Sequence, residues 1–511
     1  MAGLHDGVTT PTAPTPRRRR GVAVLESPSF EKVFFEHLLP NRPAILRGVV
    51  DSWAAFRTWS ADLDLLVRGP LEQATVPVDV QPESGKTTGY GELRRVEQKL
   101  SEFARRWARR RAEGRAEDVG EQVGWAYLKD WHFARDWPAE AAAAYQPPAA
   151  LGADWLNGWW LGPRDSGEWE GRAGDGDGDG DGDGESGGGG DDDHEPPDDF
   201  RFVYIGPRGS WTALHHDVLC SHSWSANIVG SKRWLLFPPS VSALLRDESG
   251  ALVPDARPEC AADRSAWPRL GEALAAARDV VQRPGELIFV PSGWHHQVHN
   301  LEDCVSINHN WFSSPCLRSV SRFICSEAAA VRGAIGELRG PPGCSSTDPS
   351  LMEPREWAAH CERMMRANCG MSLAEFVAML AHFARRAAAE PAGFVAEFEQ
   401  RQVGRVLRGM LGASELDEGD EGDEGDEGDE GGGRGRGAAG WSSRAVRLLA
   451  ALEGATGRPA ESGGAAGGDE ATAALEKRRL GHHRWARARR RRARLEGSVA
   501  WPRTSEWRVS E

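Results

Sequence analysis

The sequence predicts a mainly β core, a barrel or jelly roll, with helices before and after it along the chain. Between Phe200 and Phe312, short runs of β-branched and aromatic residues are separated by Gly and Pro. The runs are FRFVYIG, HSWSANIVG, KRWLLFPP, ELIFVPSGWHHQVHN and CVSINHNW. Several short strands at such close spacing favour an antiparallel barrel over alternating strands and helices.

The segments on either side carry mostly helical patterns, recognised by apolar residues three or four positions apart. Before the barrel we expect a helix over Phe30–Leu38 that Pro40 ends, a strand over Ala44–Val50, an amphipathic helix within 92–117, and an aromatic stretch, Trp125–Trp137, packed on the core. After Leu317 we expect helices that include Trp357–Met365 and Ser372–Arg386, and one more near Arg444–Leu452.

Two acidic runs interrupt these patterns. Asp175–Asp199 holds 12 acidic residues and Glu415–Glu430 holds 11, and without them the formal charge changes from −14 to +9. Gly-Asp and Gly-Asp-Glu repeats have too few apolar residues to offset the entropy of ordering, so we predict disordered inserts. Neither run has the twelve-residue loop and closing Glu of a helix-loop-helix calcium site.

The eight cysteines are dispersed, without any Cys-x-x-Cys pair. This pattern favours reduced thiols in a reducing compartment over a disulfide scaffold or a zinc module. Residues 1–20 lack the apolar core of a signal peptide, and no later apolar run approaches about 18 residues. We therefore expect a soluble protein of the cytoplasm that does not enter the membrane, with the nucleus as a second location.

Histidines and one aspartate predict a metal site. In His215-His216-Asp217, the first and third side chains of an extended strand point the same way and the second points away. A second cluster, His295-His296, follows about eighty positions later. Two imidazoles and one carboxylate on one face of an iron(II) ion leave positions open for a co-substrate and O₂. Spacing alone leaves the third ligand open between His295 and His296.

Two further features surround this cluster. Lys232 lies in the apolar strand GSKRWLLFP, where a buried ammonium needs a partner such as a dicarboxylate, unless it reaches solvent at the strand edge. In the segment Val305–Trp311, alternation places Ser306, Asn308 and Asn310 on one face. A polar face on a buried strand indicates a ligand cavity inside a barrel.

Taken together, HxD, GxKRWLLFP, PGELIFVPSGWHH and SINHNW resemble the Jumonji C (JmjC) hydroxylases. The phrases YLKDWHF, DWLNGWW and FRFVYIGPRGSW are similar to the branch described as a lysyl hydroxylase of the eukaryotic peptide-chain release factor. The resemblance covers roughly 22–173 and 198–390. It implies a double-stranded β-helix (cupin) fold and a catalytic centre that uses iron(II), 2-oxoglutarate and O₂.

Carried over residue by residue, the resemblance implies that His215, Asp217 and His296 are the catalytic metal ligands. His296 is preferred to His295 because the family pattern is W-x-H. Lys232 would pair with the distal carboxylate of 2-oxoglutarate with the Thr212 hydroxyl beside it, and Asn310 would line the pocket. The implied activity is hydroxylation of a lysyl side chain in a protein, with a release factor, and so translation termination, as its target.

These observations divide the chain into six parts. They are a disordered N-terminus (1–21), the first part of the hydroxylase module (22–173), a disordered acidic insert (174–199), the β-helix core (200–316), a helical region (317–412), and a low-complexity acidic and then Arg-rich tail (413–511). The sequence predicts no oligomeric state.

Three alternatives remain open. A JmjC methyl-lysine demethylase would use the same iron chemistry, although the scattered cysteines provide no zinc-finger reader module. A non-catalytic cupin binding module would not need the complete ligand set. The Arg-rich segment Lys477–Arg494 with Trp485 would suit RNA binding or nuclear import, yet its composition favours a solvated basic tail.

Overall fold

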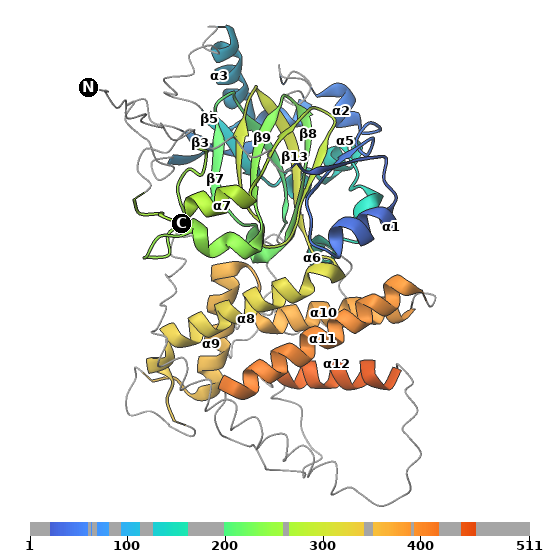
Figure 1. Cartoon of the computed structure of the whole chain (residues 1–511), viewed down its shortest axis with the longest axis vertical. Coiled ribbons are helices and arrows are strands. Elements are labelled where there is room, and N and C mark those ends of the chain that lie inside the picture. Colours follow the sequence, from blue (N-terminus) through green and yellow to red (C-terminus); the bar gives the residue numbers. More distant parts are fainter. Residues whose placement is uncertain are drawn as a thin grey trace, which may run out of the picture.

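The computed structural model of the chain (Figure 1) describes residues 21–59, 63, 69–80, 94–112, 126–161, 199–258, 265–341, 351–389, 393–417 and 441–455. The predicted disordered N-terminus except Gly21, nearly all of the first acidic insert, most of the second acidic run and the Arg-rich tail lie outside these residues. Asp199 is described: it is buried and pairs with Arg201 at 2.7 Å.

Eight consecutive strands form the barrel and are divided equally between two sheets. They are β6 (Arg201–Gly206), β7 (Trp211–His215), β8 (His222–Val229), β9 (Lys232–Phe237), β10 (Arg278–Gln282), β11 (Leu287–Val290), β12 (His295–Asn300) and β13 (Cys304–Trp311). One sheet contains the order β11-β8-β13-β6 and the other is β10-β9-β12-β7. The predicted double-stranded β-helix is therefore confirmed.

Strands from the N-terminal segment extend the first sheet at both edges. On one side, β1 (Ala23–Glu26) pairs with β2 (Ala44–Arg47), and β2 pairs with β11. On the other side, β5 (Ala126–Trp131) pairs with β6, and β3 (Thr75–Val80) and β4 (Arg94–Lys99) follow. The described part of the N-terminal segment and the barrel thus share one nine-stranded sheet.

Helices cover the outer face of this large sheet, where apolar residues of alternating strand positions form the main core. Among them are α1 (Phe30–Val33), a π-helical turn η1 (Phe34–Leu38), α2 (Ala54–Thr58), α4 (Phe133–Asp136) and α5 (Pro138–Ala144) (Figure 1). The expected helix within 92–117 is only partly present, because its first residues form β4, in which Val96 pairs with Val78. Helix α3 (Leu100–Ala112) follows and buries Phe103 and Trp107.

The second sheet is covered by a shorter segment between β9 and β10. The 3₁₀ turn η6 (Pro239–Leu245) and helix α7 (Leu270–Ala276) pack on Leu214, Leu235 and Phe237. Neither element was predicted from the sequence. A smaller apolar group, which includes Trp234, Ile288 and Val298, forms a separate cluster.

The region after the barrel is helical as predicted. It consists of α8 (Leu317–Ala334), α9 (Pro354–Cys369), α10 (Leu373–Ala389), α11 (Phe394–Asp417) and α12 (Trp441–Ala455), which lie together below the barrel (Figure 1). Helix α6 (Trp155–Leu161) connects the two parts, since Trp155 stacks on Phe383 with ring centroids 4.6 Å apart. Among the described residues, no helix is both long and apolar enough to cross a membrane.

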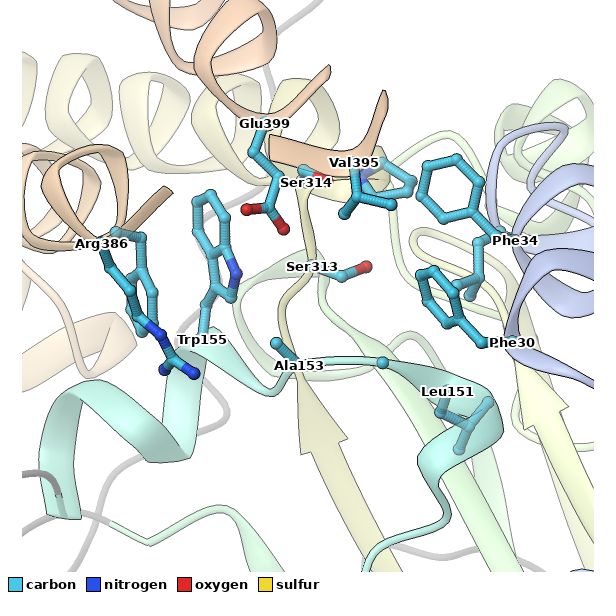
Figure 2. A pocket seen from close by; sticks show the side chains of 14 residues that line it. Phe30, Phe34, Leu151, Ala153, Trp155, Ser313, Ser314, Arg386, Val395 and Glu399 are labelled. Carbon is cyan, nitrogen blue, oxygen red and sulfur yellow. The ribbon is translucent and has the colours of Figure 1, made fainter. Parts of the chain in front are cut away.

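A cavity of about 120 Å³ lies where α1, the start of α6 and the C-terminal helices meet. Figure 2 shows the rings of Phe30, Phe34 and Trp155 around it, with oxygen atoms of Ser313 and Glu399 directed inward. None of the residues predicted to bind metal or co-substrate lines this cavity. It is therefore a feature of the junction between barrel and helices, separate from the predicted catalytic centre.

His222, the first residue of β8, predicts how stability depends on pH. Its ring lies between Phe289 and Trp311, its Nδ1 accepts the Ser292 N–H at 2.9 Å, and burial lowers its pKa to about 3. The unfolded chain, with a pKa near 6.5, binds the proton first. Neutral His222 therefore contributes stability that is complete above pH 6.5 and falls by about 1.4 kcal/mol per pH unit below it.

We expect the His222→Gln variant to lose less stability than the wild type when the pH falls from 7.5 to 5.5. Urea midpoints at the two pH values measure this difference. An equal loss in both proteins would contradict the assignment.

Candidate active site

Three of the predicted residues meet at one end of the barrel. The candidate ligand atoms of His215, Asp217 and His296 all lie within 4.8 Å of one another, and His296 Nε2 is 3.9 Å from Asp217 Oδ2. His215 ends β7 and pairs directly with His296 on the antiparallel strand β12. Two neighbouring strands thus supply the two imidazoles, and the extended residue after β7 supplies the carboxylate.

A bulge in β7 determines which side chains enter the barrel. Thr212 pairs with Val298 and His215 pairs with His296, so three steps along β7 match two steps along β12. In a regular strand, Thr212 and His215 would point to opposite faces. The bulge adds one residue and brings both onto the same face.

Hydrogen bonds orient the triad. Nδ1 of His215 is 2.8 Å from the Ala213 carbonyl oxygen, and Nδ1 of His296 is 3.1 Å from that of Trp294. Because a carbonyl can only accept, each Nδ1 carries the proton and each Nε2 has a lone pair for a metal. Ser223 donates to Asp217 Oδ2 at 2.8 Å. Burial, then His296 and Lys129, hold the pKa of His215 well below its usual range.

Two tight turns adjoin the metal-ligand candidates, one after Asp217 and one before β12. After Asp217 the backbone of Leu219 and Cys220 is left-handed, with φ of 53° at both, a strained conformation for side chains of this size. The turn before β12 contains Gly293 at φ 72°, where a β-carbon would lie 3.3 Å from Cys220 Sγ. The two turns therefore pack against each other beside the triad.

The remaining histidines of this region have other partners. His216 and His295 pack edge to face with ring centroids 5.2 Å apart, and His295 Nδ1 is 3.1 Å from Ser242 Oγ. His299 stacks on Trp211, and His309 Nε2 is 2.8 Å from the Tyr145 hydroxyl. These contacts leave His296, rather than His295, beside His215 and Asp217.

Lys232 is buried inside the barrel, where its side chain points toward β13. It is 2% exposed, and its Nζ donates to Ser306 Oγ at 2.6 Å. Burial lowers its pKa to about 8. Within the described part of the chain, no carboxylate lies within 4.0 Å of this ammonium. A buried ammonium of this kind fits a carboxylate ligand. The negative charge of the ligand would compensate for the hydration that the ammonium loses on burial.

The other predicted pocket residues occupy the same interior. Thr212 and Asn300 lie close enough to the buried Tyr127 hydroxyl to lower its pKa, although burial outweighs them and raises that pKa. Asn310 donates to Ser221 Oγ at 3.2 Å, and Asn308 donates to Ser306 Oγ at 3.3 Å. Tyr127 was missed by the sequence analysis, although the alternation of YLKDW around buried Leu128 could have placed it on this face.

The comparisons with known proteins agree with this arrangement. Residues 30–316 match the family model of the cupin-like domain. The chain is 32% identical over 361 residues to the 2-oxoglutarate and iron-dependent oxygenase JMJD4 of Gallus gallus, covering 69% of this chain and 71% of that protein. It is 32% identical over 383 residues to JMJD4 of Homo sapiens, covering 72% and 78%.

A plant relative carries a different printed activity. The arginine-specific demethylase JMJ20 of Arabidopsis thaliana is 32% identical over 348 residues, covering 68% of this chain and 66% of that protein. The chain belongs to the cupin-like JmjC family of 2-oxoglutarate and iron-dependent oxygenases, which work with iron(II), 2-oxoglutarate and O₂.

Proposed function

We propose that the chain hydroxylates a lysyl side chain of a protein, with the translation release factor as its substrate. The observation that carries the proposal is the His215–Asp217–His296 cluster with the enclosed Lys232 in the same barrel. The resemblance of YLKDWHF, DWLNGWW and FRFVYIGPRGSW to the release-factor branch supports the choice of substrate.

The donor set fits iron(II). Two neutral imidazoles and one carboxylate are the ligands of mononuclear iron oxygenases, and the candidate ligand atoms of the three residues lie within 4.8 Å of one another. We assign these three residues as the metal ligands. When bound, iron and 2-oxoglutarate supply the oxidising power that replaces a substrate C–H hydrogen by a hydroxyl group.

The protein's own residues bind and orient. Lys232 provides a cation for the distal carboxylate of 2-oxoglutarate, and Thr212 provides a hydroxyl close to Tyr127. Asn310 is held by Ser221 and lines the same interior. Ser223 fixes Asp217, so that the carboxylate keeps its direction through the reaction.

We place this reaction in the cytoplasm, where a release factor acts. The six described cysteines are all free thiols, which is typical of a reducing compartment.

A second candidate is demethylation of a methylated nitrogen. The relation to the protein named arginine-specific demethylase JMJ20 favours it. It requires the same metal and co-substrate, so only the product distinguishes it from hydroxylation.

Mass spectrometry of the product tests the proposed reaction. The purified chain, iron(II) and 2-oxoglutarate are incubated with release factor in air, and we expect one lysine to gain a single oxygen. Omission of 2-oxoglutarate should prevent the gain. Loss of a methyl group from methylated histones, without any oxygen gained by the release factor, would instead establish the second candidate.

Adjacent histidines provide a matched test of the metal site. We expect His296→Gln to lower iron(II) affinity and 2-oxoglutarate turnover by more than about 100-fold, because it removes a ligand. His295→Gln makes the same chemical change on the opposite face of β12 and should retain iron binding. Iron content after dialysis and succinate formation are the measurements. Equal losses in the two variants would refute the assignment.

Lys232→Met tests the carboxylate anchor. We expect the Kd for 2-oxoglutarate to rise about 100-fold, because a buried charge partner is removed. Without 2-oxoglutarate, the variant should be at least as stable as the wild type, since it no longer buries an ammonium without a carboxylate. The control is Lys99→Met, an exposed lysine whose Nζ bonds the Gln73 carbonyl oxygen.

The same residue predicts a pH effect on affinity. With its pKa near 8 in the absence of co-substrate, Lys232 loses its charge as the pH rises above 8. The wild-type Kd for 2-oxoglutarate should then rise up to tenfold per pH unit, whereas the Lys232→Met variant should lack this increase. Titrations between pH 7 and 10 measure both, and a parallel increase in the variant would exclude Lys232 as its cause.

A further inference from the structure

The loop that follows the π-helical turn η1 contacts the turn before β12 directly. Asn41 Nδ2 donates to the Ser292 carbonyl oxygen at 2.9 Å, and the Asn41 carbonyl oxygen accepts the indole N–H of Trp294 at 3.0 Å. Asn41 and Ser292 are 251 positions apart along the chain. Two hydrogen bonds thus join the N-terminal segment to the turn that precedes His296.

The pairing of β2 with β11 brings the two segments together. Phe289 pairs with Ala44 in an antiparallel register. Carried three residues further, beyond the end of β11 and back from the start of β2, the same register places Ser292 opposite Asn41. The contact therefore continues the large sheet beyond its last paired residues.

The backbone conformation of Asn41 suits few residues. Its φ is 53°, in the left-handed region, where asparagine is tolerated better than most side chains. The Asn41 N–H donates to the Leu38 carbonyl oxygen at 3.2 Å, and the Arg42 N–H donates to that of His37 at 2.9 Å, which closes the turn. Asparagine therefore combines the required backbone angle with an amide that reaches the opposite segment.

Trp294 connects this contact to the metal-ligand candidate His296. The Trp294 carbonyl oxygen lies 3.1 Å from His296 Nδ1 and, because it can only accept, it fixes the tautomer that leaves Nε2 for a metal. The Trp294 ring is 6% exposed and belongs to the same apolar cluster as Ile45 of β2. The N-terminal segment thus holds the residue whose carbonyl group orients the imidazole.

Ser292 connects the contact to the other metal-ligand turn. Its hydroxyl donates to the Cys220 carbonyl oxygen in the strained turn after Asp217, and its N–H donates to His222 Nδ1 at 2.9 Å. Since the Asn41 amide bonds its carbonyl oxygen, every polar group of Ser292 has a partner on another segment. Ser292 therefore joins the N-terminal loop to both turns beside the triad.

We propose that Asn41 is a positioning residue of the metal site, which holds the His296 imidazole in its ligating orientation through Trp294 and Ser292. The inference rests on one part of the proposed function, the assignment of His296 as a metal ligand, and holds for any substrate. Residues that hold metal ligands from behind change metal affinity by about 10- to 100-fold when they are lost. Part of the precision of the site thus comes from outside the barrel.

Asn41→Gly tests the proposal, because glycine keeps the left-handed backbone and the carbonyl oxygen and removes only the amide. We expect the Kd for manganese(II), an iron(II) substitute that is stable in air, to rise about tenfold or more. The visible spectrum of the cobalt(II)-loaded variant, which reports ligand geometry, should differ from that of the wild type. The urea midpoint of the metal-free variant should stay within about 0.5 M of wild type, since one hydrogen bond is lost.

Two further variants complete the comparison. Trp294→Phe keeps a ring in the apolar cluster but removes the indole N–H, so its manganese(II) Kd should also rise, and it decides the outcome if Asn41→Gly does not fold. Ser27→Gly is the matched control. Ser27 is an exposed residue of the same segment with a φ of 41°, and its N–H bonds the carbonyl oxygen of Arg47 at the other end of β2. This control should retain wild-type manganese(II) affinity.

Unchanged manganese(II) affinity in Asn41→Gly, or an equal loss in Ser27→Gly, would overturn the proposal. An unchanged cobalt(II) spectrum would also overturn it, because the variant would then hold His296 as the wild type does. Failure of the metal-ligand assignment has a different signature, since His296→Gln would then bind manganese(II) as tightly as wild type. Weak binding by His296→Gln together with wild-type binding by Asn41→Gly would overturn the role of Asn41 alone.

Discussion

The side chains that β8 and β13 direct into the barrel are polar and almost fully buried, so each needs a hydrogen-bond partner there. Ser306 Oγ accepts hydrogen bonds from Lys232 and Asn308, and Ser221 Oγ accepts one from Asn310. Such an interior cannot supply the main hydrophobic stabilisation. The main apolar core therefore lies on the outer face of the large sheet, beneath the N-terminal helices. Stability and chemistry are separated on the two faces of the same strands.

Regular alternation made much of this predictable. In β13 the sequence places Val305 and Ile307 opposite Ser306 and Asn308, and the structure buries the first pair in the outer core and the second in the barrel. The helices after Leu317 follow from their apolar spacing. His215 and Asp217 could be placed on one face because they lie beyond the irregular part of β7, whereas the choice of His296 over His295 came from the family resemblance.

The sequence could not reveal the places where alternation fails. Two bulges each add a residue that no sequence pattern predicts. One lies between Thr212 and His215 and the other at Lys129–Asp130. Without the first, Thr212 would point away from the site. Strand β4, within the expected helix, could not be predicted either. Its charged residues pair with β3 at the edge of the sheet, far along the chain from the barrel.

The strand order of the nine-stranded sheet also determines how long its edges stay unpaired during synthesis. Strand β2 emerges early, yet its partner in the barrel is β11, where Leu287 pairs with Leu46. At ribosomal rates of about 5 to 20 residues per second, roughly 12 to 50 seconds pass between the synthesis of β2 and that of β11. The π-helical turn η1 remains without its partners for longer, since Phe34 packs on Phe394 and Phe398. The nascent chain therefore keeps these strand edges and apolar faces unpaired until nearly the whole catalytic module has left the ribosome.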